Sequence, residues 1–227
     1  MAPTVILTIG HSNRSLDEFL GLLAIHRVSL LVDVRTLPGS RRNPHFARDA
    51  LAAALARAGI EYVHVPELGG RRRPLPHSTN TAWRHEGFRG FADHMQTASF
   101  ESGLEFVLGR AAGAVPALMC AEAVPWRCHR SLIADGLVAR GARVEHILGP
   151  HARRPHVLSP GARVVGRPRF IPGRAAPRRV LRSSRTSSSP RKNPILITRG
   201  TKPRSGTERA CDGATPLLAF WLEVLEA

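Results

Sequence analysis

Hydrophobic residues between residues 4 and 158 follow two alternating spacings. Short runs of aliphatic and β-branched residues are separated by longer stretches in which apolar positions recur every three or four residues. Such runs are typical of buried strands, and such stretches are typical of amphipathic helices. We therefore predict five strands, at residues 5–9, 29–34, 61–66, 115–122 and 143–148.

Helix signals fill the gaps between these strands. Ser15 and Glu18 have the S-x-x-E spacing of a capping box, which predicts a helix that begins beside them. Further helices are predicted at residues 49–59, 100–110 and 128–141. The segment 71–81 reads as loop, and 83–97 is either irregular or helical.

Strands and helices that alternate with short connections indicate an α/β fold. The run at 29–34 is nearly all apolar, as expected of a parallel strand that is covered on both faces. A chain of 227 residues is long enough for such a domain with a sizeable core. We predict a single α/β domain whose mostly parallel five-stranded sheet is flanked by helices.

The periodicity fails beyond about Gly166, where Arg, Pro and Ser dominate. This composition buries too little apolar surface to offset the entropy of ordering the chain. We therefore divide the chain into an α/β domain at 1–158 and a disordered, basic, Arg/Ser/Pro-rich tail at 159–227. The pattern of the last residues, 216–227, predicts either a short amphipathic helix or an irregular segment.

The formal net charge is +16, and most of it lies in the tail. Residues 1–150 hold 17 arginines against 13 carboxylates, whereas residues 151–227 hold 16 Lys and Arg against 4 carboxylates. The basicity therefore assigns no nucleic-acid role to the folded part by itself.

The sequence favours a cytoplasmic protein without a membrane partner. It has no run of about 18 apolar residues, and its N-terminus reads as a strand rather than a signal peptide. Three cysteines, Cys120, Cys128 and Cys211, do not make a disulfide framework, which fits a reducing compartment. The oligomeric state stays open.

Polar residues gather where the predicted strands end. Ligands of parallel α/β sheets bind beyond the carboxyl ends of the strands, so we expect these residues to meet at one edge. The candidate site residues are His11, Ser12, Asp33, Arg35, Ser40, Arg41, Gly69, Gly70, Cys120, Glu122, Cys128, His129 and Arg130.

Cys120 lies between a strand and a helix start, where a helix dipole and Arg127 or Arg130 would stabilise a thiolate. Phosphatase and sulfurtransferase loops use C-x5-R, and the spacing here is one residue longer. A small buried cysteine is the alternative. Glu122 is either an acid or base, or a partner for an arginine.

Two other candidate groups also have two interpretations. Asp33 and Arg35 share one face of their strand, and they either bind a ligand or pair with each other to order a loop. The turn at His11 and Ser12 precedes a helix. Its backbone N–H groups either bind an anion or belong to an ordinary capped turn.

The sequence predicts neither a metal nor another cofactor. Cys128 and His129, together with Cys120 or His11, have donor atoms that zinc accepts. No CxxC or HxxxH spacing is present, however, so we assign no metal ligands.

Several short motifs resemble the domain-of-unknown-function family number 488 over about residues 4–148. They are T-I-G-H-S at 8–12, D-V-R at 33–35, P-x-S-R at 38–41, L-G-G at 68–70, C-A-E at 120–122, C-H-R at 128–130 and H-I at 146–147. The resemblance implies an α/β domain and a common polar site formed by the thirteen candidate residues. It implies no reaction, and the segment after Gly166 looks foreign to the family.

Three functions remain open. The first is an enzyme that acts on an anionic nucleotide, phosphoester or nucleic acid. Cys120, Glu122 and His129 are its catalytic candidates, and the other ten site residues would bind substrate. The second is a non-catalytic nucleic-acid-binding module. The low aromatic content, 5% of residues, argues against it because few side chains could stack on bases. The third is a regulatory domain that binds a small anion.

Overall fold

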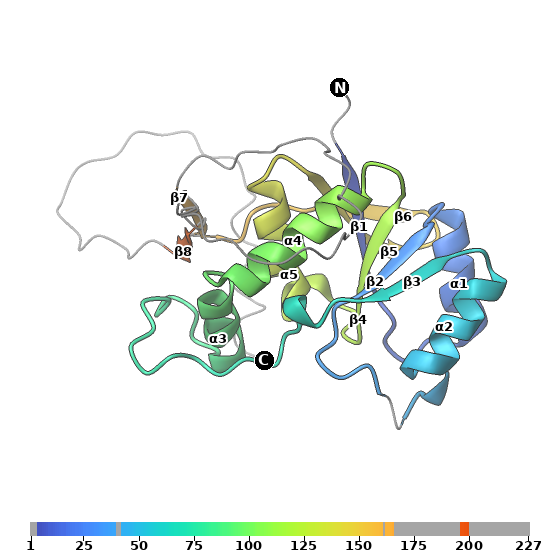
Figure 1. The fold of residues 1–227 in the computed structure, drawn as a ribbon, viewed down its shortest axis with the longest axis horizontal. Helices are drawn as coiled ribbons and strands as arrows, with labels where there is room; N and C mark the ends of the chain where they lie inside the picture. The colour runs from blue at the N-terminus through green and yellow to red at the C-terminus, as the bar shows by residue number, and fades with distance from the viewer. Residues whose placement is uncertain (1–3, 40–41, 161, 166–195, 200–227) are drawn as a thin grey trace, which may run out of the picture.

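A computed structural model of the chain describes residues 4–39, 42–160, 162–165 and 196–199. Its main sheet has six strands in the order β3-β2-β4-β1-β5-β6 (Figure 1). The strands are β1 (Val5–Gly10), β2 (Leu30–Asp33), β3 (Glu61–His64), β4 (Pro116–Cys120), β5 (Arg143–Gly149) and β6 (Ala152–Pro155). Pairing among β1 to β5 is parallel, whereas β6 runs antiparallel to β5.

The sheet is therefore mixed and six-stranded, which corrects the prediction of five mostly parallel strands. The sixth strand, Ala152–Pro155, is exposed at all of its positions and reads ARRP. A strand at the edge can pair through its backbone alone, so it carries no hydrophobic alternation that sequence analysis could detect. Charged residues and proline are common on such edges because they discourage further strand pairing.

The described residues form five α-helices, which cover the two faces of the sheet (Figure 1). They are α1 (Leu16–Ile25), α2 (Arg48–Arg57), α3 (Glu86–His94), α4 (Ala98–Arg110) and α5 (Arg130–Val138). One core joins α1 and α2 to side chains such as Leu7 and Leu31. A second core joins α3, α4 and α5 to side chains such as Ile6 and Val32 on the opposite face. This alternation along β1 and β2 confirms that these strands are buried on both faces.

The start of α1 contains half of the predicted capping box. The Ser15 hydroxyl accepts a hydrogen bond from the backbone N–H of Glu18 at 3.1 Å. The Glu18 carboxylate pairs with Arg14 at 3.0 Å. The ambiguous segment 83–97 contains α3, which begins after His85 as N-cap.

Part of the predicted tail is described as strand. β7 (Ala162–Val165) and β8 (Leu196–Arg199) pair antiparallel as a separate two-stranded sheet, where we predicted irregular chain. The segments 166–195 and 200–227, with the C-terminal amphipathic pattern, lie outside the described residues. Among the residues that are described, no helix is both long enough and apolar enough to span a membrane.

Gly10 allows the loop after β4 to approach β1 closely. A Cβ atom at Gly10 would lie 2.0 Å from the backbone oxygen of Glu122. This is far inside van der Waals contact, and the opposing atom belongs to backbone rather than to a movable side chain. Only glycine therefore lets these two chain segments meet at the carboxyl edge of the sheet.

We expect Gly10→Ala to lower the free energy of unfolding by about 1–3 kcal/mol, because the backbone near Glu122 must move. Gly21→Ala is the matched control, since a Cβ there meets no atom within 4 Å and lies in α1. Alanine in a helix interior is favoured over glycine by about 1 kcal/mol, so the control should be at least as stable as wild type. Urea unfolding measures both, and equal stability of Gly10→Ala and wild type would contradict the close approach.

Candidate active site at the carboxyl edge of the sheet

The polar residues lie at a topological switch point. β2 and β4 are neighbours in the sheet, but β2 leads into α2 on one face and β4 leads into α5 on the other. Backbone pairing continues past the strand ends, since the N–H groups of His11 and Ser12 donate to the carbonyls of Cys120 and Ala121, both at 2.9 Å. Open α/β sheets bind their ligands in the crevice at such a point.

The side chains on the α1–α2 face form the Asp33 cluster (His11, Asp33, Arg35 and Tyr62). The Asp33 carboxylate accepts from Arg35 Nη2 at 2.6 Å and from the Tyr62 hydroxyl at 2.8 Å. Burial alone would lower the pKa of Arg35, but its hydrogen bonds and attraction to Asp33 raise it above the ordinary value. Burial and the Asp33 charge raise the pKa of Tyr62. The cluster therefore contains the Asp33–Arg35 pair that one of the two interpretations from the sequence predicted.

His11 completes this cluster as a neutral ring. Its Nδ1–H donates to the Ser12 carbonyl at 2.8 Å, so Nε2 is left to accept from Arg35 at 3.4 Å. Burial, opposed by the Ser12 carbonyl, lowers the pKa of His11 to about 4. The ring stacks on Phe46 with 4.2 Å between centroids. Both ring nitrogens are therefore engaged, and His11 does not join the cysteines.

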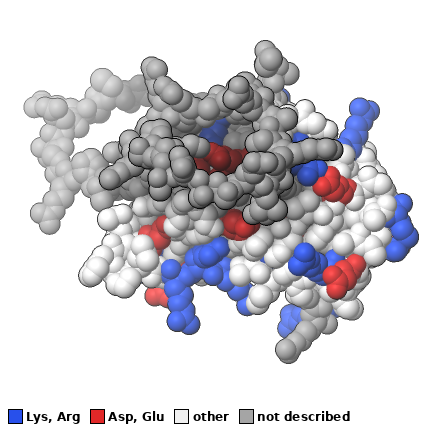
Figure 2. Space-filling view, viewed as in Figure 1, with Lys and Arg blue, Asp and Glu red and all other residues white. Residues whose placement is uncertain are grey.

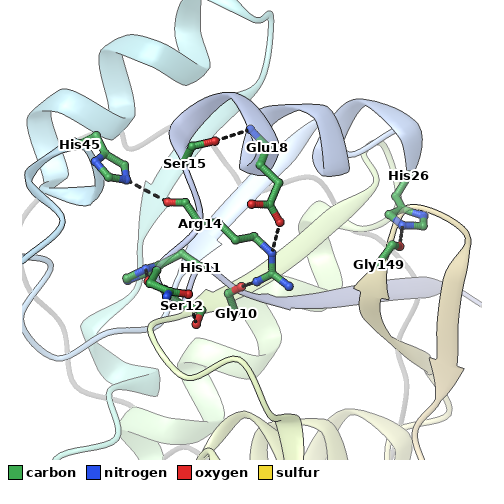
Figure 3. A network of polar contacts seen from close by, with 10 residues as sticks. Gly10, His11, Ser12, Arg14, Ser15, Glu18, His26, His45 and Gly149 are labelled. Carbon is green, nitrogen blue, oxygen red and sulfur yellow. Dashed lines mark hydrogen bonds and ion pairs between the residues drawn. The ribbon is translucent and has the colours of Figure 1, made fainter.

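The turn after β1 is held by further local contacts, which Figure 3 displays. Arg14 donates to the Gly10 carbonyl at 2.5 Å, and the Arg14 carbonyl is itself bonded to His45 at 3.1 Å. Ser12 adopts a positive φ of 52° within this turn. These contacts hold the turn in its observed conformation.

A cavity of about 440 Å³ opens on the α3–α5 face. Its lining residues are Gly70, His85, Gly87, Phe88, Cys120, Ala121, Glu122, Arg127, Cys128 and His129. Five of the predicted site residues are therefore brought together here. His11, Ser12, Asp33, Arg35, Gly69 and Arg130 do not line it, and Ser40 and Arg41 lie outside the described residues.

Cys120, Cys128 and His129 form the sulfur–imidazole cluster at this cavity. His129 Nδ1 lies 3.6 Å from Cys128 Sγ and 4.0 Å from Cys120 Sγ. His129 Nε2–H donates to the Val34 carbonyl at 3.1 Å, so the lone pair of Nδ1 faces the two sulfurs. Gly70 makes room for the ring, because a Cβ there would be 2.3 Å from Nδ1.

The two sulfurs differ in their surroundings. A hydrogen bond to Cys128 and burial raise the pKa of Cys120. The same bond from Cys120 and the charge of Arg130 lower the pKa of Cys128 well below its ordinary value. The sequence predicts that Arg127 or Arg130 stabilises a thiolate at Cys120, whereas Arg130 donates to Cys128 Sγ at 3.4 Å. Cys128 and Arg130 are two residues apart at the start of α5, which brings their side chains together.

Arg130 lies beneath the cavity as a fully buried side chain. It donates to the Glu122 carbonyl at 2.5 Å, to the Thr8 hydroxyl at 3.2 Å and to Cys128 Sγ at 3.4 Å. All three contacts are internal, so Arg130 supports the site from below and its guanidinium does not face the cavity.

A chain of hydrogen bonds continues from Arg130 across the core. Thr8 bonds to His146 Nδ1 at 2.8 Å, His146 Nε2 to His156 Nδ1 at 3.0 Å, and His156 Nε2 to Asp135 at 2.8 Å. A carboxylate only accepts, so His156 donates its Nε2–H to Asp135, and the Thr8 hydroxyl accepts from Arg130 at the other end of the chain. Sequence analysis missed Thr8, Asp135 and His156. The available signal was Asp135, a carboxylate in the helix α5, most of whose residues are buried.

The chain was compared with models of known protein families. A family model described as domain of unknown function DUF488 matches residues 15–137. The chain belongs to the DUF488 family. Searches of curated proteins and of solved structures gave no match. The match confirms the resemblance stated from the sequence. It begins after the T-I-G-H-S motif and ends before His146, so it is shorter than the segment 4–148.

The DUF488 domain contributes further cavity residues that sequence analysis did not assign to the site. His85 and Phe88 come from the segment 83–97, whose loop-or-helix ambiguity concealed their position. Arg127 was considered only as support for a thiolate, but it is exposed and lines the cavity. Within the described part of the chain it forms no ion pair.

The buried His146 imidazole predicts that the protein is sensitive to acid. Burial and nearby His156 lower the pKa of His146 from 6.5 to about 3. The unfolded chain therefore binds a proton at a higher pH than the folded one. The contribution of His146 is complete above pH 6.5 and is lost as the pH falls toward 3, at about 1.4 kcal/mol per pH unit. Urea unfolding between pH 7.5 and 5 should show a shallower pH dependence for His146→Gln than for wild type. Parallel curves would mean that His146 titrates alike in both states.

Proposed function

We propose that this DUF488 protein is an enzyme that acts on a small anionic substrate in the cavity. The observation that carries the proposal is the convergence of Glu122, Arg127 and the sulfur–imidazole cluster on one cavity at the switch point of the sheet. A carboxylate, a cation and polarised sulfur in one concave site are typical of catalysis.

The charge at the cavity favours an anion. Arg127 lines the cavity, and Arg71 directly follows the lining residue Gly70. Both side chains are exposed, and neither forms an ion pair with a described residue. The volume of about 440 Å³ falls within the range of small-molecule sites. A nucleotide or another phosphoester fits both features.

Glu122 is the acid–base candidate. Its Oε1 accepts from the backbone N–H of Val124 at 3.0 Å, which orients the carboxylate at the cavity. Its Oε2 has no hydrogen bond to a described residue, so one oxygen is free to exchange a proton with a bound substrate or water. Arg130 holds the same residue through its carbonyl, so the position of Glu122 depends on the buried chain.

A nucleic-acid-binding module is less well supported. On the face drawn in Figure 2, arginines lie beside carboxylates rather than forming a continuous basic surface. The sole tyrosine, Tyr62, is bonded to Asp33 and is not free to stack on a base. Phosphate contacts would need several unpaired cations on one surface.

Thermal unfolding with a panel of phosphate, nucleoside monophosphates and short oligonucleotides tests the proposal. A ligand specific for the native state stabilises by about 2.7 kcal/mol at a hundredfold excess over Kd. We expect one small anion to raise Tm in wild type and to lose most of this effect in Arg127→Gln. Arg57→Gln is the matched control, because Arg57 is exposed at the end of α2 on the other face and should leave the shift intact.

Glu122→Gln separates binding from chemistry. It should keep the Tm shift and abolish turnover of the same ligand, since the amide cannot transfer the proton. The proposal fails if no small anion shifts Tm, or if Arg127→Gln and Arg57→Gln respond alike. A shift with oligonucleotides alone would favour the nucleic-acid-binding module.

A further inference from the structure

Three soft donor atoms in the sulfur–imidazole cluster face one point. The two Sγ atoms and His129 Nδ1 all lie within 4.8 Å of one another. A tetrahedral zinc with Zn–S of about 2.3 Å and Zn–N of about 2.0 Å separates sulfur from nitrogen by roughly 3.6 Å and sulfur from sulfur by roughly 3.8 Å. The observed S···N separations of 3.6 and 4.0 Å differ from this by a few tenths of an ångström at most.

The surroundings of these donors are those of a metal site. His129 donates its other ring N–H to the Val34 carbonyl, which fixes the tautomer in which Nδ1 can bind a cation. Arg130 donates to Cys128 Sγ at 3.4 Å, which offsets negative charge on that sulfur. Such outer contacts orient ligands before any ion arrives.

The chain topology explains how the donors meet without a CxxC motif. Cys120 ends β4, whereas Cys128 and His129 stand at the start of α5 after the short turn Pro125–Arg127. The strand end and the helix start therefore supply the two sides of the cluster. The sequence prediction of no metal depended on spacing alone, which this arrangement does not need.

We propose that Cys120, Cys128 and His129 bind one thiophilic divalent cation of the zinc type. Binding displaces any protons that the two cysteines hold, which pass to solvent, and leaves two thiolates and one imidazole on the ion. Because all three residues line the cavity, the fourth coordination position faces it. Three protein ligands with an open position are characteristic of catalytic rather than structural zinc.

This site deepens the proposed function in one respect, and that extension rests on the proposed function. An ion at the cluster would share the cavity with Glu122 and Arg127, so a bound water and an anionic substrate would meet there. The reaction class would then be metal-assisted hydrolysis. Metal binding itself requires only the cluster and is testable without substrate.

Cobalt substitution provides the test on the full-length, reduced protein. Co²⁺ added to chelator-treated protein should give thiolate charge-transfer absorption in the near ultraviolet that saturates at one equivalent. Cys120→Ser, Cys128→Ser and His129→Gln should each weaken binding at least tenfold. Cys211→Ser is the matched control and should bind as wild type does, since that cysteine is not one of the three proposed ligands; it lies outside the described residues.

A second measurement uses wild type alone and does not depend on whether the variants fold. Zn²⁺ should slow alkylation of Cys120 and Cys128 at least tenfold and leave Cys211 unaffected, as read by peptide mass spectrometry. No charge-transfer band, or a band that persists in Cys128→Ser, would overturn the site. Protection absent from both cysteines, with a Cys120–Cys128 disulfide formed in air, would identify a redox pair. None of these results bears on the Tm shift with anions, so the two proposals fail separately.

Discussion

The burial of one positive charge, that of Arg130, constrains the architecture around the cavity. An arginine with no exposed surface must have its donors satisfied, because an unpaired buried charge costs several kcal/mol. Its partners come from β1, from the loop after β4 and from Cys128, two residues before α5. One side chain thereby fixes three chain segments, and Gly10 permits the first two to approach. The position of Cys128 follows from this anchoring.

The carboxyl edge divides its polar residues between the two faces of the sheet. On the α1–α2 face, Asp33 and Arg35 form a buried ion pair with each other. On the α3–α5 face, Glu122, Arg127 and the sulfur–imidazole cluster line an open cavity. The two groups touch through backbone, since His129 donates to the carbonyl of Val34, which lies between Asp33 and Arg35.

The sequence predicted the features that depend on local pattern. The five strands β1 to β5, the cap at Ser15 and five of the cavity residues follow from hydrophobic spacing and from the carboxyl-edge rule. The sequence could not predict β6, whose pairing is through backbone, or the hydrogen bond from Arg130 to Cys128. It also could not separate the two faces of the edge, because the turns after the strands decide where side chains such as His11 point.

A double-mutant cycle between Arg130→Lys and His156→Gln tests the central claim most directly, with urea unfolding as the measurement. The two residues share no direct hydrogen bond and are linked through Thr8 and His146. If Arg130 anchors one continuous network, the two losses of stability should be non-additive by at least about 0.5 kcal/mol. Additivity within about 0.3 kcal/mol would show that the chain does not act as a unit and would contradict the account.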